Sequence, residues 1–385
     1  MAPSRSPFAI FDDPAGEDFS LGVEEEFFLV DAETRALRGD ADVVLAGARA
    51  PEGGDLGVEL KRSQLETGSA VCRDLDELRA SIIELRRALG ESATAEGARI
   101  VALATHPFAT WSDDPGVTPD AAYLELDATY GMLTSEQSVC GSHVHVGVRD
   151  PDVAIEVMNR CRAWIPTLVA LTANSPYWMG HDSKYASYRT QVFHRWPTAG
   201  IPEHLDGRAG YDRVLEELTA TESIDGPARL YWDIRPSARY PTLEFRSDDV
   251  LTTVDESVAT AAVIRALVQT AHADALAEVP YDPPSPELLR SALWRASRFG
   301  LSEQLVDVGA LRLRPGPEVL GSLLEHVRPV LEERGEWAEV VATAGFVLRE
   351  GTGAERQRRS REGEGTEGLR AVVDRAVTAT TARTA

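Results

Sequence analysis

Alternating apolar and polar residues predict several strands in the first 250 residues of the chain. Residues 21–30, LGVEEEFFLV, place apolar, aromatic and β-branched side chains around a short acidic run, which is typical of a strand. Because successive side chains of a strand point to opposite faces, Glu24 and Glu26 share one face and Glu25 lies on the other. The other expected strands are residues 58–68, 99–104, 139–148 and 241–246.

Apolar residues spaced three and four apart predict helices. Residues 74–90 carry such a stripe of leucine and isoleucine, and Asp74 with Glu77 resembles a capping box at its start. Pro151, directly after Asp150, is typical of a helix N-terminus, and that helix is expected to reach about residue 172. Further helices are expected at residues 210–220, 254–278, 286–298, 317–333 and 336–349.

The same pattern divides the chain into three parts. Residues 1–19 are expected to be a loose leader, residues 20–350 a single α+β domain, and residues 351–385 a charged, mobile tail. Within the domain, residues 174–200 combine aromatic side chains, arginine and proline. A loop of this length in a compact domain is typical of a functional segment.

Charge and cysteine content narrow the class of protein. The chain has 39 Lys and Arg against 62 Asp and Glu, a net charge of −23, which argues against nucleic acid and anionic membranes as partners. Its three cysteines lack metal-binding spacing, so reduced thiols and a cytoplasmic location are expected. We find no signal peptide and no apolar run of about 18 residues that could span a membrane.

Polar side chains recur on the expected strands. Period two puts Leu60, Arg62, Gln64 and Glu66 on one face of residues 58–68. The candidate site groups are Glu24 with Glu26, Glu66, His143 with His145, and Glu244 with Arg246. Carboxylates that share a face otherwise suited to burial repel each other, so a cation is expected between them.

A hard divalent ion such as Mg²⁺ prefers oxygen ligands and would fit such a cluster. Two other interpretations stay open when each motif is taken alone. The acidic run also fits a solvated edge strand, and the histidine pair also fits a zinc or iron half-site or two surface residues.

Arginines are dense in the second half of this acidic chain. The guanidinium group offers a bidentate fork to phosphate and carboxylate oxygens. For Arg195 and Arg239 we favour surface salt bridges, whereas Arg235 and Arg246 stand among apolar and aromatic residues and are candidates for function. A Walker loop, a Rossmann glycine motif and a GxSxG elbow are all missing from the sequence.

Several segments together resemble the glutamate–cysteine ligase type 2 family, also called carboxylate–amine ligases. They span roughly residues 20 to 358 and are LGVEEEFFLVD, SQLETGSAVCRDL, THPF, CGSHVHVGV, ANSPYW, YASYRTQVFHRWPTAG, LYWDIRPSARYPTLEFR and GTGAERQ. The resemblance implies an antiparallel sheet curved into a funnel with helices outside, similar to the catalytic domain of glutamine synthetase.

The resemblance also implies an activity and its residues. The activity is ATP-dependent amide formation through an acyl phosphate, with small carboxylate and amine substrates such as amino acids, and with glutamate and cysteine as one pair. The implied Mg²⁺ ligands are Glu24, Glu26, Glu66, His143 and Glu244. The implied phosphate-facing catalytic residues are Arg235 and Arg246, and Arg189 joins them in binding nucleotide or substrate.

Two alternatives to the ligase remain at this point. A metal-dependent hydrolase would use the HxH motif and the carboxylates to activate water and would need no ATP. A non-catalytic relative would bind nucleotide without releasing phosphate. Assembly into a homo-oligomer is left open.

Overall fold

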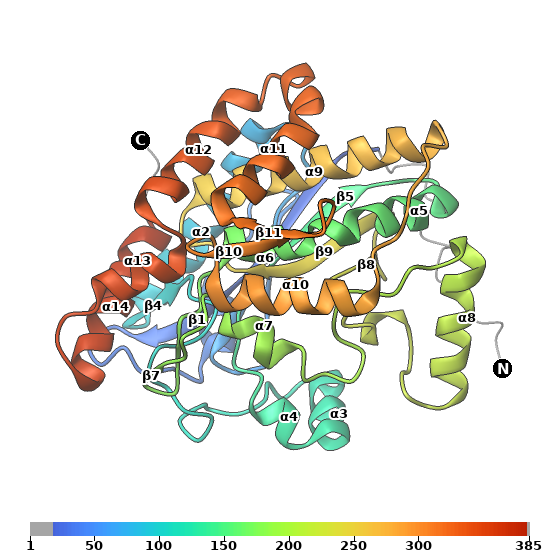
Figure 1. Cartoon of the computed structure of the whole chain (residues 1–385). Coiled ribbons are helices and arrows are strands. Elements are labelled where there is room, and N and C mark those ends of the chain that lie inside the picture. The colour runs from blue at the N-terminus through green and yellow to red at the C-terminus, as the bar shows by residue number, and fades with distance from the viewer. Residues whose placement is uncertain (1–17, 383–385) are drawn as a thin grey trace.

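The computed structural model describes residues 18–382, so the expected leader, residues 1–19, lies almost entirely outside the described part. The chain centres on an antiparallel seven-stranded sheet in the order β2–β3–β1–β5–β9–β8, with β4 also pairing with β1 (Figure 1). The strands are β1 (Leu21–Asp31), β2 (Asp55–Val58), β3 (Gln64–Gly68), β4 (Ala98–Val101), β5 (Gly141–Gly147), β8 (Ile234–Pro236) and β9 (Thr242–Asp249).

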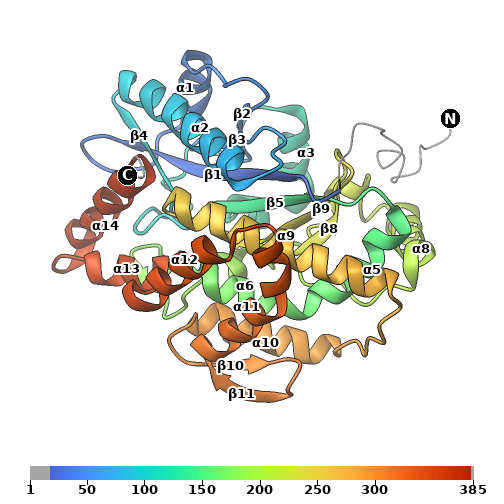
Figure 2. The ribbon, with the colours of Figure 1, turned by 90° about the horizontal axis from the view of Figure 1, so that it is seen from above.

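Helices bury one face of this sheet. Val23, Val144 and Phe245 are buried in the same hydrophobic core as residues of the covering helices. The helices of this core that contact the strands include α2 (Leu75–Ala95), α5 (Pro151–Cys161), α6 (Ile165–Thr172) and α9 (Val254–Leu276). Figure 2 shows α9 between the sheet and the outer helices α11 (Gly316–Glu333) and α12 (Trp337–Glu350). The other face of the central strands is left for polar side chains.

Local sequence explains where these helices begin and end. Asp74 accepts a hydrogen bond from the backbone N–H of Glu77 at 2.9 Å, as the capping pattern predicted. The single helix expected up to residue 172 is instead divided into α5, a short 3-10 turn and α6. Pro166, in the first turn of α6, has no N–H with which to continue a helix from the preceding turn.

The prediction of one continuous strand over residues 58–68 is wrong, because these residues form the turn and the second strand of a hairpin. β2 ends at Val58 and β3 begins at Gln64. The turn between them is closed by hydrogen bonds in both directions. The N–H of Gln64 donates to the carbonyl of Lys61 at 2.9 Å, and the N–H of Lys61 donates to Oε1 of Gln64 at 3.1 Å. Leu60 and Arg62 therefore do not share the strand face of Glu66.

The segment expected to be a charged, mobile tail instead contains two helices, α13 (Gly353–Ser360) and α14 (Gly365–Thr380). A reciprocal capping box between Thr352 and Glu355 begins α13. Buried Val372 and Val373 of α14 pack the chain end onto the body of the protein. The many charges of this segment concealed a short apolar stripe, and the packed unit extends to Thr380.

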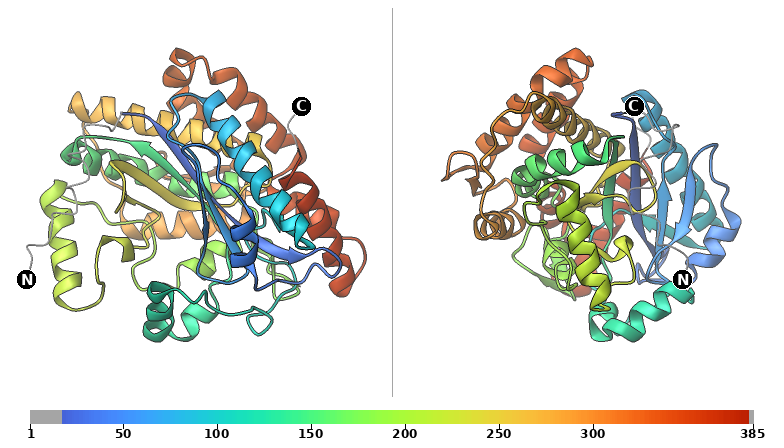
Figure 3. Two further views of the ribbon diagram at one scale, coloured as in Figure 1. Left: turned by 180° about the vertical axis from the view of Figure 1, so that it is seen from behind. Right: turned by 90° about the vertical axis from the view of Figure 1, so that its right-hand side faces the viewer.

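The C-terminal helices lie beside the N-terminal strands and α2, as the view from behind shows (Figure 3). No helix within residues 18–382 has the length and apolar character needed to cross a membrane. The remaining elements are α1 (Ala41–Gly47), α3 (Ala121–Tyr130), α4 (Met132–Ser135), β6 (Tyr177–Trp178), β7 (His181–Asp182), α7 (Tyr188–Phe193), α8 (Gly207–Ala220), α10 (Pro286–Phe299), β10 (Gln304–Asp307) and β11 (Arg312–Pro315).

Candidate active site

Strand register brings the polar residues of the sequence motifs together. On β1, Glu24 stands opposite His143 of β5, and Glu26 stands opposite Glu66 of β3. His145 of β5 in turn pairs with Glu244 of β9. Neighbouring strands thus gather carboxylates and imidazoles on one face of the sheet, where the sequence predicted a polar cluster.

Glu25 points to the opposite face, as the alternation predicted. Its carboxylate accepts hydrogen bonds from Arg86 at 2.8 and 2.6 Å and from the Ser257 hydroxyl at 2.6 Å. Both members of the Glu25–Arg86 pair are buried, at 1% and 2% exposure of the side chain. Of the three consecutive glutamates, the middle one therefore has a structural role, in which it binds Arg86 on the helix-covered face of the sheet.

Two groups of three side chains could each hold a metal ion. One group is Glu24, Glu66 and His143, and the other is Glu24, His145 and Glu244. Within each group the potential ligand atoms lie within 4.8 Å of one another. Glu24 belongs to both groups, with its carboxylate 3.1 Å from His143 Nδ1 and 3.4 Å from His145 Nε2.

The electrostatics of these groups favour a cation. Burial, together with the charges of Glu59, Glu24 and Glu26, holds the pKa of Glu66 well above its usual value. Burial, with Glu59 beside it, also raises the pKa of Glu26 to about 7. Carboxylates crowded in this way are stabilised as anions when a positive ion lies between them.

Glu24 differs from its neighbours. Burial would raise its pKa, but hydrogen bonds with His143 and His145 outweigh that effect and hold the pKa well below the usual value. His143 Nε2 is buried and has no hydrogen-bond partner among residues 18–382. A set of carboxylate oxygens with one imidazole per group suits Mg²⁺ or Mn²⁺ better than a thiolate-seeking metal. The residues present therefore fit a hard divalent ion.

Four of the five predicted metal ligands belong to the two metal-donor groups, and Glu26 does not. Glu24, Glu66, His143 and Glu244 fall within the two groups, and His145 joins them. Glu26 belongs to neither group. Its Oε2 accepts the backbone N–H of Gly141 at 2.5 Å, and its side chain lines a cavity next to the groups.

Arg235 and Arg246 both converge on Glu244. Arg235 donates to the two Glu244 oxygens at 2.9 and 3.2 Å and to the carbonyls of Ala228 and Leu230 at 2.8 and 2.7 Å. Arg246 forms an ion pair with Glu244 through Nη1. Despite burial, these two arginines keep the pKa of Glu244 low. The donors of Arg235 are thus used within the protein, whereas buried Nε of Arg246 has no partner among the described residues.

Arg189 lies beside Arg246 and has few internal partners. It donates to the carbonyls of Ser247 at 3.3 Å and Arg246 at 3.2 Å, and its Nε is buried without a partner in the described part of the chain. The guanidinium carbons of Arg189 and Arg246 lie 5.1 and 6.0 Å from the centre of the Phe193 ring. Two guanidinium groups thus flank one aromatic ring at the edge of the metal-donor groups.

A strand irregularity and a glycine make room for Arg189. The β5–β9 register shifts between Ser142 and Val144, so that β9 bulges where Arg246 and Ser247 present their carbonyls to Arg189. A Cβ atom at Gly141 would lie only 2.1 Å from Arg189 Nη2. Glycine at this position is therefore required for the close approach of the guanidinium.

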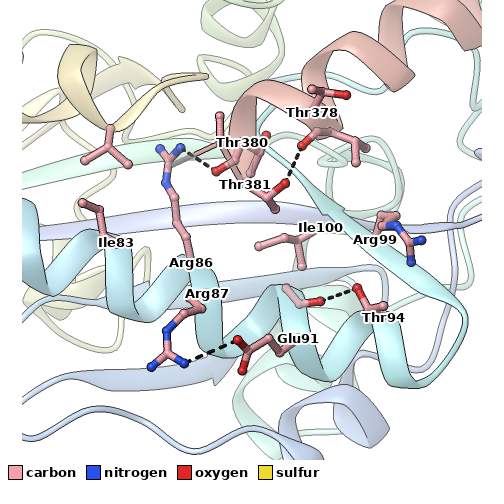
Figure 4. A pocket seen from close by; sticks show the side chains of 14 residues that line it. Ile83, Arg86, Arg87, Glu91, Thr94, Arg99, Ile100, Thr378, Thr380 and Thr381 are labelled. Carbon is pink, nitrogen blue, oxygen red and sulfur yellow. Dashed lines mark hydrogen bonds and ion pairs between the residues drawn. The ribbon is translucent and has the colours of Figure 1, made fainter. Parts of the chain in front are cut away.

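One cavity is lined by residues of the metal-donor groups, and a second is lined by Glu26 and Arg246, which contact His143 and Glu244 of those groups. The larger, about 380 Å³, is lined by Glu24, Glu66, His145, Tyr240, Arg73 and Arg239 together with glycines of β1, β3 and the β2 hairpin. The smaller, about 170 Å³, is lined by Glu26, Glu59, Arg189, Arg246, Tyr123, Tyr231, Phe193 and Trp196. A third cavity of about 630 Å³ lies between α2 and α14 (Figure 4). None of the predicted site residues is part of its described lining.

The sequence prediction missed Glu59. Its carboxylate accepts a hydrogen bond from the Tyr123 hydroxyl at 3.0 Å and lines the smaller cavity. Glu59 directly follows β2, two positions after Gly57, which pairs with Glu66. Period two along a single strand of residues 58–68 puts Glu59 opposite to Glu66, so only the hairpin could have revealed it. Tyr123 comes from α3, which carried no signal. Arg195 pairs with Glu136, as the salt-bridge interpretation predicted.

The chain is similar to glutamate–cysteine ligases over most of its length. The sequence profile described as glutamate-cysteine ligase family 2 matches residues 20–375. A Frankia alni protein provisionally named glutamate–cysteine ligase 2-2 is 43% identical over 353 residues, covering 88% of this chain and 91% of that protein. A Rhodopirellula baltica protein provisionally named glutamate–cysteine ligase 2 is 39% identical over 348 residues, covering 89% and 93%.

Solved structures share the fold. Glutamate–cysteine ligase from Francisella tularensis, in complex with AMP, matches with a TM-score of 0.71 and 13% identity, over 96% of this chain and 90% of that one. The bifunctional glutathione synthetase of Pasteurella multocida matches with a TM-score of 0.69 and 18% identity, over 94% and 52%. The hydrolase alternative finds no support in these comparisons. The chain belongs to the glutamate–cysteine ligase family 2 and is an ATP-dependent carboxylate–amine ligase.

Proposed function

We propose that the protein joins an acidic amino acid to an amine, using Mg²⁺ and ATP, across the larger and the smaller cavity of the site. The observation that carries this proposal is the position of Glu24, which belongs to both donor groups and lines the larger cavity, while Arg246, the ion-pair partner of Glu244, lines the smaller one. Phosphoryl transfer needs the nucleotide and the acceptor on either side of charge-neutralising groups. The arrangement of the two cavities meets that need.

The larger cavity is the better candidate for the nucleotide. Its volume of about 380 Å³ exceeds that of the smaller cavity, and Gly22, Gly53 and Gly57 leave its walls free of side chains there. Tyr240 and Arg239, which are both exposed, line it and offer an aromatic surface and a cation. Mg²⁺ held by the two donor groups would neutralise phosphate oxygens at the inner end of this cavity.

The smaller cavity is the better candidate for the acid. Arg189 and Arg246 offer guanidinium donors to carboxylate oxygens, while Glu26 and Glu59 offer acceptors to an ammonium group. A cavity of about 170 Å³ matches an amino acid in size and is too small for a nucleotide. Glutamate, which the names of the relatives include, has both kinds of charged group.

Each residue then has a defined part in the reaction. Arg246 stabilises the negative charge that builds up while the γ-phosphoryl group moves to the substrate carboxylate, giving an acyl phosphate and ADP. Arg235 holds Glu244 in place from behind through two hydrogen bonds. The amine attacks the acyl carbon, phosphate leaves, and the amine proton passes to a carboxylate of the cavity or to water. The products are an amide, ADP and phosphate.

Three finer features of the prediction also belong to this proposal. The sheet is expected to curve into a funnel like that of the glutamine synthetase catalytic domain. The cytoplasm is the expected location, and the three cysteines, all free and buried, agree with a reducing compartment. Assembly into a homo-oligomer stays a prediction.

A phosphate-release assay tests the proposed function. The protein is incubated with ATP, Mg²⁺ and a grid of amino acids and amines, and amide products are identified by mass spectrometry. We expect release that requires both an acid and an amine, with glutamate among the accepted acids, and we expect Glu24→Gln and Glu66→Gln to abolish it. Arg195→Gln is the control, because Arg195 pairs with Glu136 outside the donor groups. Phosphate release that is independent of the amine would contradict amide formation.

A further inference from the structure

We propose that Asp249 is a positioning residue that sets Arg189 for the carboxylate substrate, an inference that rests on the proposed function. Asp249 is the last residue of β9, the strand that also carries Glu244 and Arg246. Its side chain is buried, at 1% exposure. It accepts hydrogen bonds from the backbone N–H of Asn174 at 2.7 Å, the Ser175 hydroxyl at 2.7 Å and the Ser187 hydroxyl at 2.8 Å.

Two of these partners hold the backbone around Arg189. Ser187 is the N-cap of α7, and its hydroxyl accepts the N–H of Thr190 at 3.4 Å. The Ser175 hydroxyl accepts the N–H of Arg189 itself at 3.0 Å. α7 contains only six residues, and a helix this short is not stable without external contacts. Asp249 therefore fixes the start of α7 through two hydroxyl groups.

The side chain of Arg189 depends on this anchor. Among the described residues its guanidinium donates only to two backbone carbonyls, those of Arg246 and Ser247, at the bulge of the same strand. Within residues 18–382 it forms no ion pair with a carboxylate. Its direction is thus set by where α7 begins and by the space above Gly141. A shift of α7 would move a cation that lines the smaller cavity.

The C-terminal segment GTGAERQ joins the same network. Nε2 of Gln357 in α13 donates to Oδ1 of Asn174 at 2.8 Å. Asn174 in turn donates through Nδ2 to the carbonyls of Ala102 and Val250 at 3.1 and 2.7 Å. A Cβ atom at Gly353 would lie 2.2 Å from Asn174 Oδ1, so α13 packs directly against this side chain. The segment thereby fixes Asn174, one of the three donors to Asp249.

Asp248 offers a matched control. It is adjacent to Asp249 and equally buried, at 1% exposure. It accepts hydrogen bonds from Thr172 of α6 and from Ser247 at 3.3 and 3.2 Å, and no described residue of α7 donates to it. Asp248→Asn therefore makes the same chemical change in the same strand without altering the anchor of α7.

The test compares Asp249→Asn and Asp248→Asn in steady-state kinetics with glutamate as the acid probe. An amide at position 249 presents an N–H₂ group to donors that need acceptors, so α7 loses part of its anchor. We expect the KM for glutamate to rise about tenfold, which corresponds to about 1.4 kcal/mol, while the KM for ATP changes by less than about twofold. A purely structural defect would lower the active fraction and kcat without this split.

Separate outcomes distinguish the two proposals. Wild-type protein that uses no acidic amino acid contradicts the proposed function. Wild-type protein that uses glutamate, with an unchanged KM in Asp249→Asn or an equal rise in Asp248→Asn, overturns the role of Asp249. If Asp249→Asn does not fold, Ser187→Ala removes the α7 cap with Asp249 retained. It is expected to raise the KM for glutamate in the same direction, and an unchanged KM would overturn the inference.

Discussion

Replacing Glu25 by glutamine should destabilise the protein strongly, although its neighbours on β1 serve the cavities. Glu25 lies on the helix-covered face and pairs with Arg86 through two hydrogen bonds at 2.8 and 2.6 Å. Glutamine has nearly the same volume but removes the negative charge and presents an N–H₂ group to a guanidinium that only donates. The change thus isolates the ion pair from packing.

The structure sets the size of the effect. Removing one partner of a buried ion pair costs about 3–5 kcal/mol, because the other charge stays buried without compensation. Arg86 would still donate to the carbonyls of Leu251 and Thr252, both at 2.9 Å, and of Thr380 at 3.3 Å. These three acceptors soften the loss, so we expect the lower end of the range, about 3 kcal/mol of unfolding free energy.

Urea unfolding followed by circular dichroism measures this change. The control is Arg87→Gln on the same helix. Arg87 pairs with Glu91 at 3.4 Å, and both side chains are more than half exposed, at 53% and 67%. Such surface pairs contribute about 0–1 kcal/mol, so the control should differ little from wild type.

A double variant makes the reasoning refutable. Glu25→Leu with Arg86→Met leaves no buried charge without a partner, although the carbonyls of Leu251, Thr252 and Thr380 lose a donor. We expect it to be more stable than Glu25→Gln. The reasoning fails if Glu25→Gln unfolds at the same urea concentration as Arg87→Gln, or if the double variant is the least stable of the three.

Three further predictions follow from other parts of the structure. Arg246→Lys keeps the charge but loses the bidentate guanidinium fork, so kcat should fall about 10²- to 10³-fold with little change in melting temperature. Near-normal turnover with lower stability would mean that Arg246 serves only the salt bridge with Glu244. His143→Ala and His145→Ala should each raise the Mg²⁺ concentration for half-maximal activity by about 10- to 100-fold, and a wild-type titration in either variant would remove that residue from the donor groups. Burial lowers the pKa of His106 to about 4, so the unfolded chain binds more protons and stability is lost as pH falls from about 6.5 towards 4. Between pH 7 and 5 this costs about 2 kcal/mol in urea unfolding, and His106→Asn should lose correspondingly less over the same interval.

Most of what the sequence predicts about the site comes from the alternation of side chains along the strands. Glu24 and Glu25 were assigned to opposite faces from period two alone, and the structure places one in the donor groups and the other against Arg86. Where two residues lie on one continuous strand, local backbone geometry determines whether their side chains share a face. The position of that strand in the sheet cannot be derived from local geometry, because it depends on which strands pair.

The incorrect predictions also concern features that depend on strand pairing and tertiary packing. Leu60 does not lie on the predicted strand face, because a turn between Lys61 and Gln64 interrupts the strand. This turn is closed by hydrogen bonds, which a pattern of apolar residues does not reveal. The phosphate-facing role of Arg235 stays a prediction, and in the structure its Nη1 donates to the carbonyls of Ala228 and Leu230. Those carbonyls come from an irregular segment whose path only tertiary packing decides.

The contact between Arg86 and Thr380 has a consequence for the time course of folding. These residues are 294 positions apart in sequence, and closing so long a loop is slow compared with local structure formation. During synthesis, Arg86 is made long before the carbonyl of Thr380 emerges, and α14 reaches β4 only at the end. The nascent chain can therefore complete the cover behind β1 only after α14 has been translated, so a chain that stalls before α14 leaves an apolar face of the sheet open to aggregation.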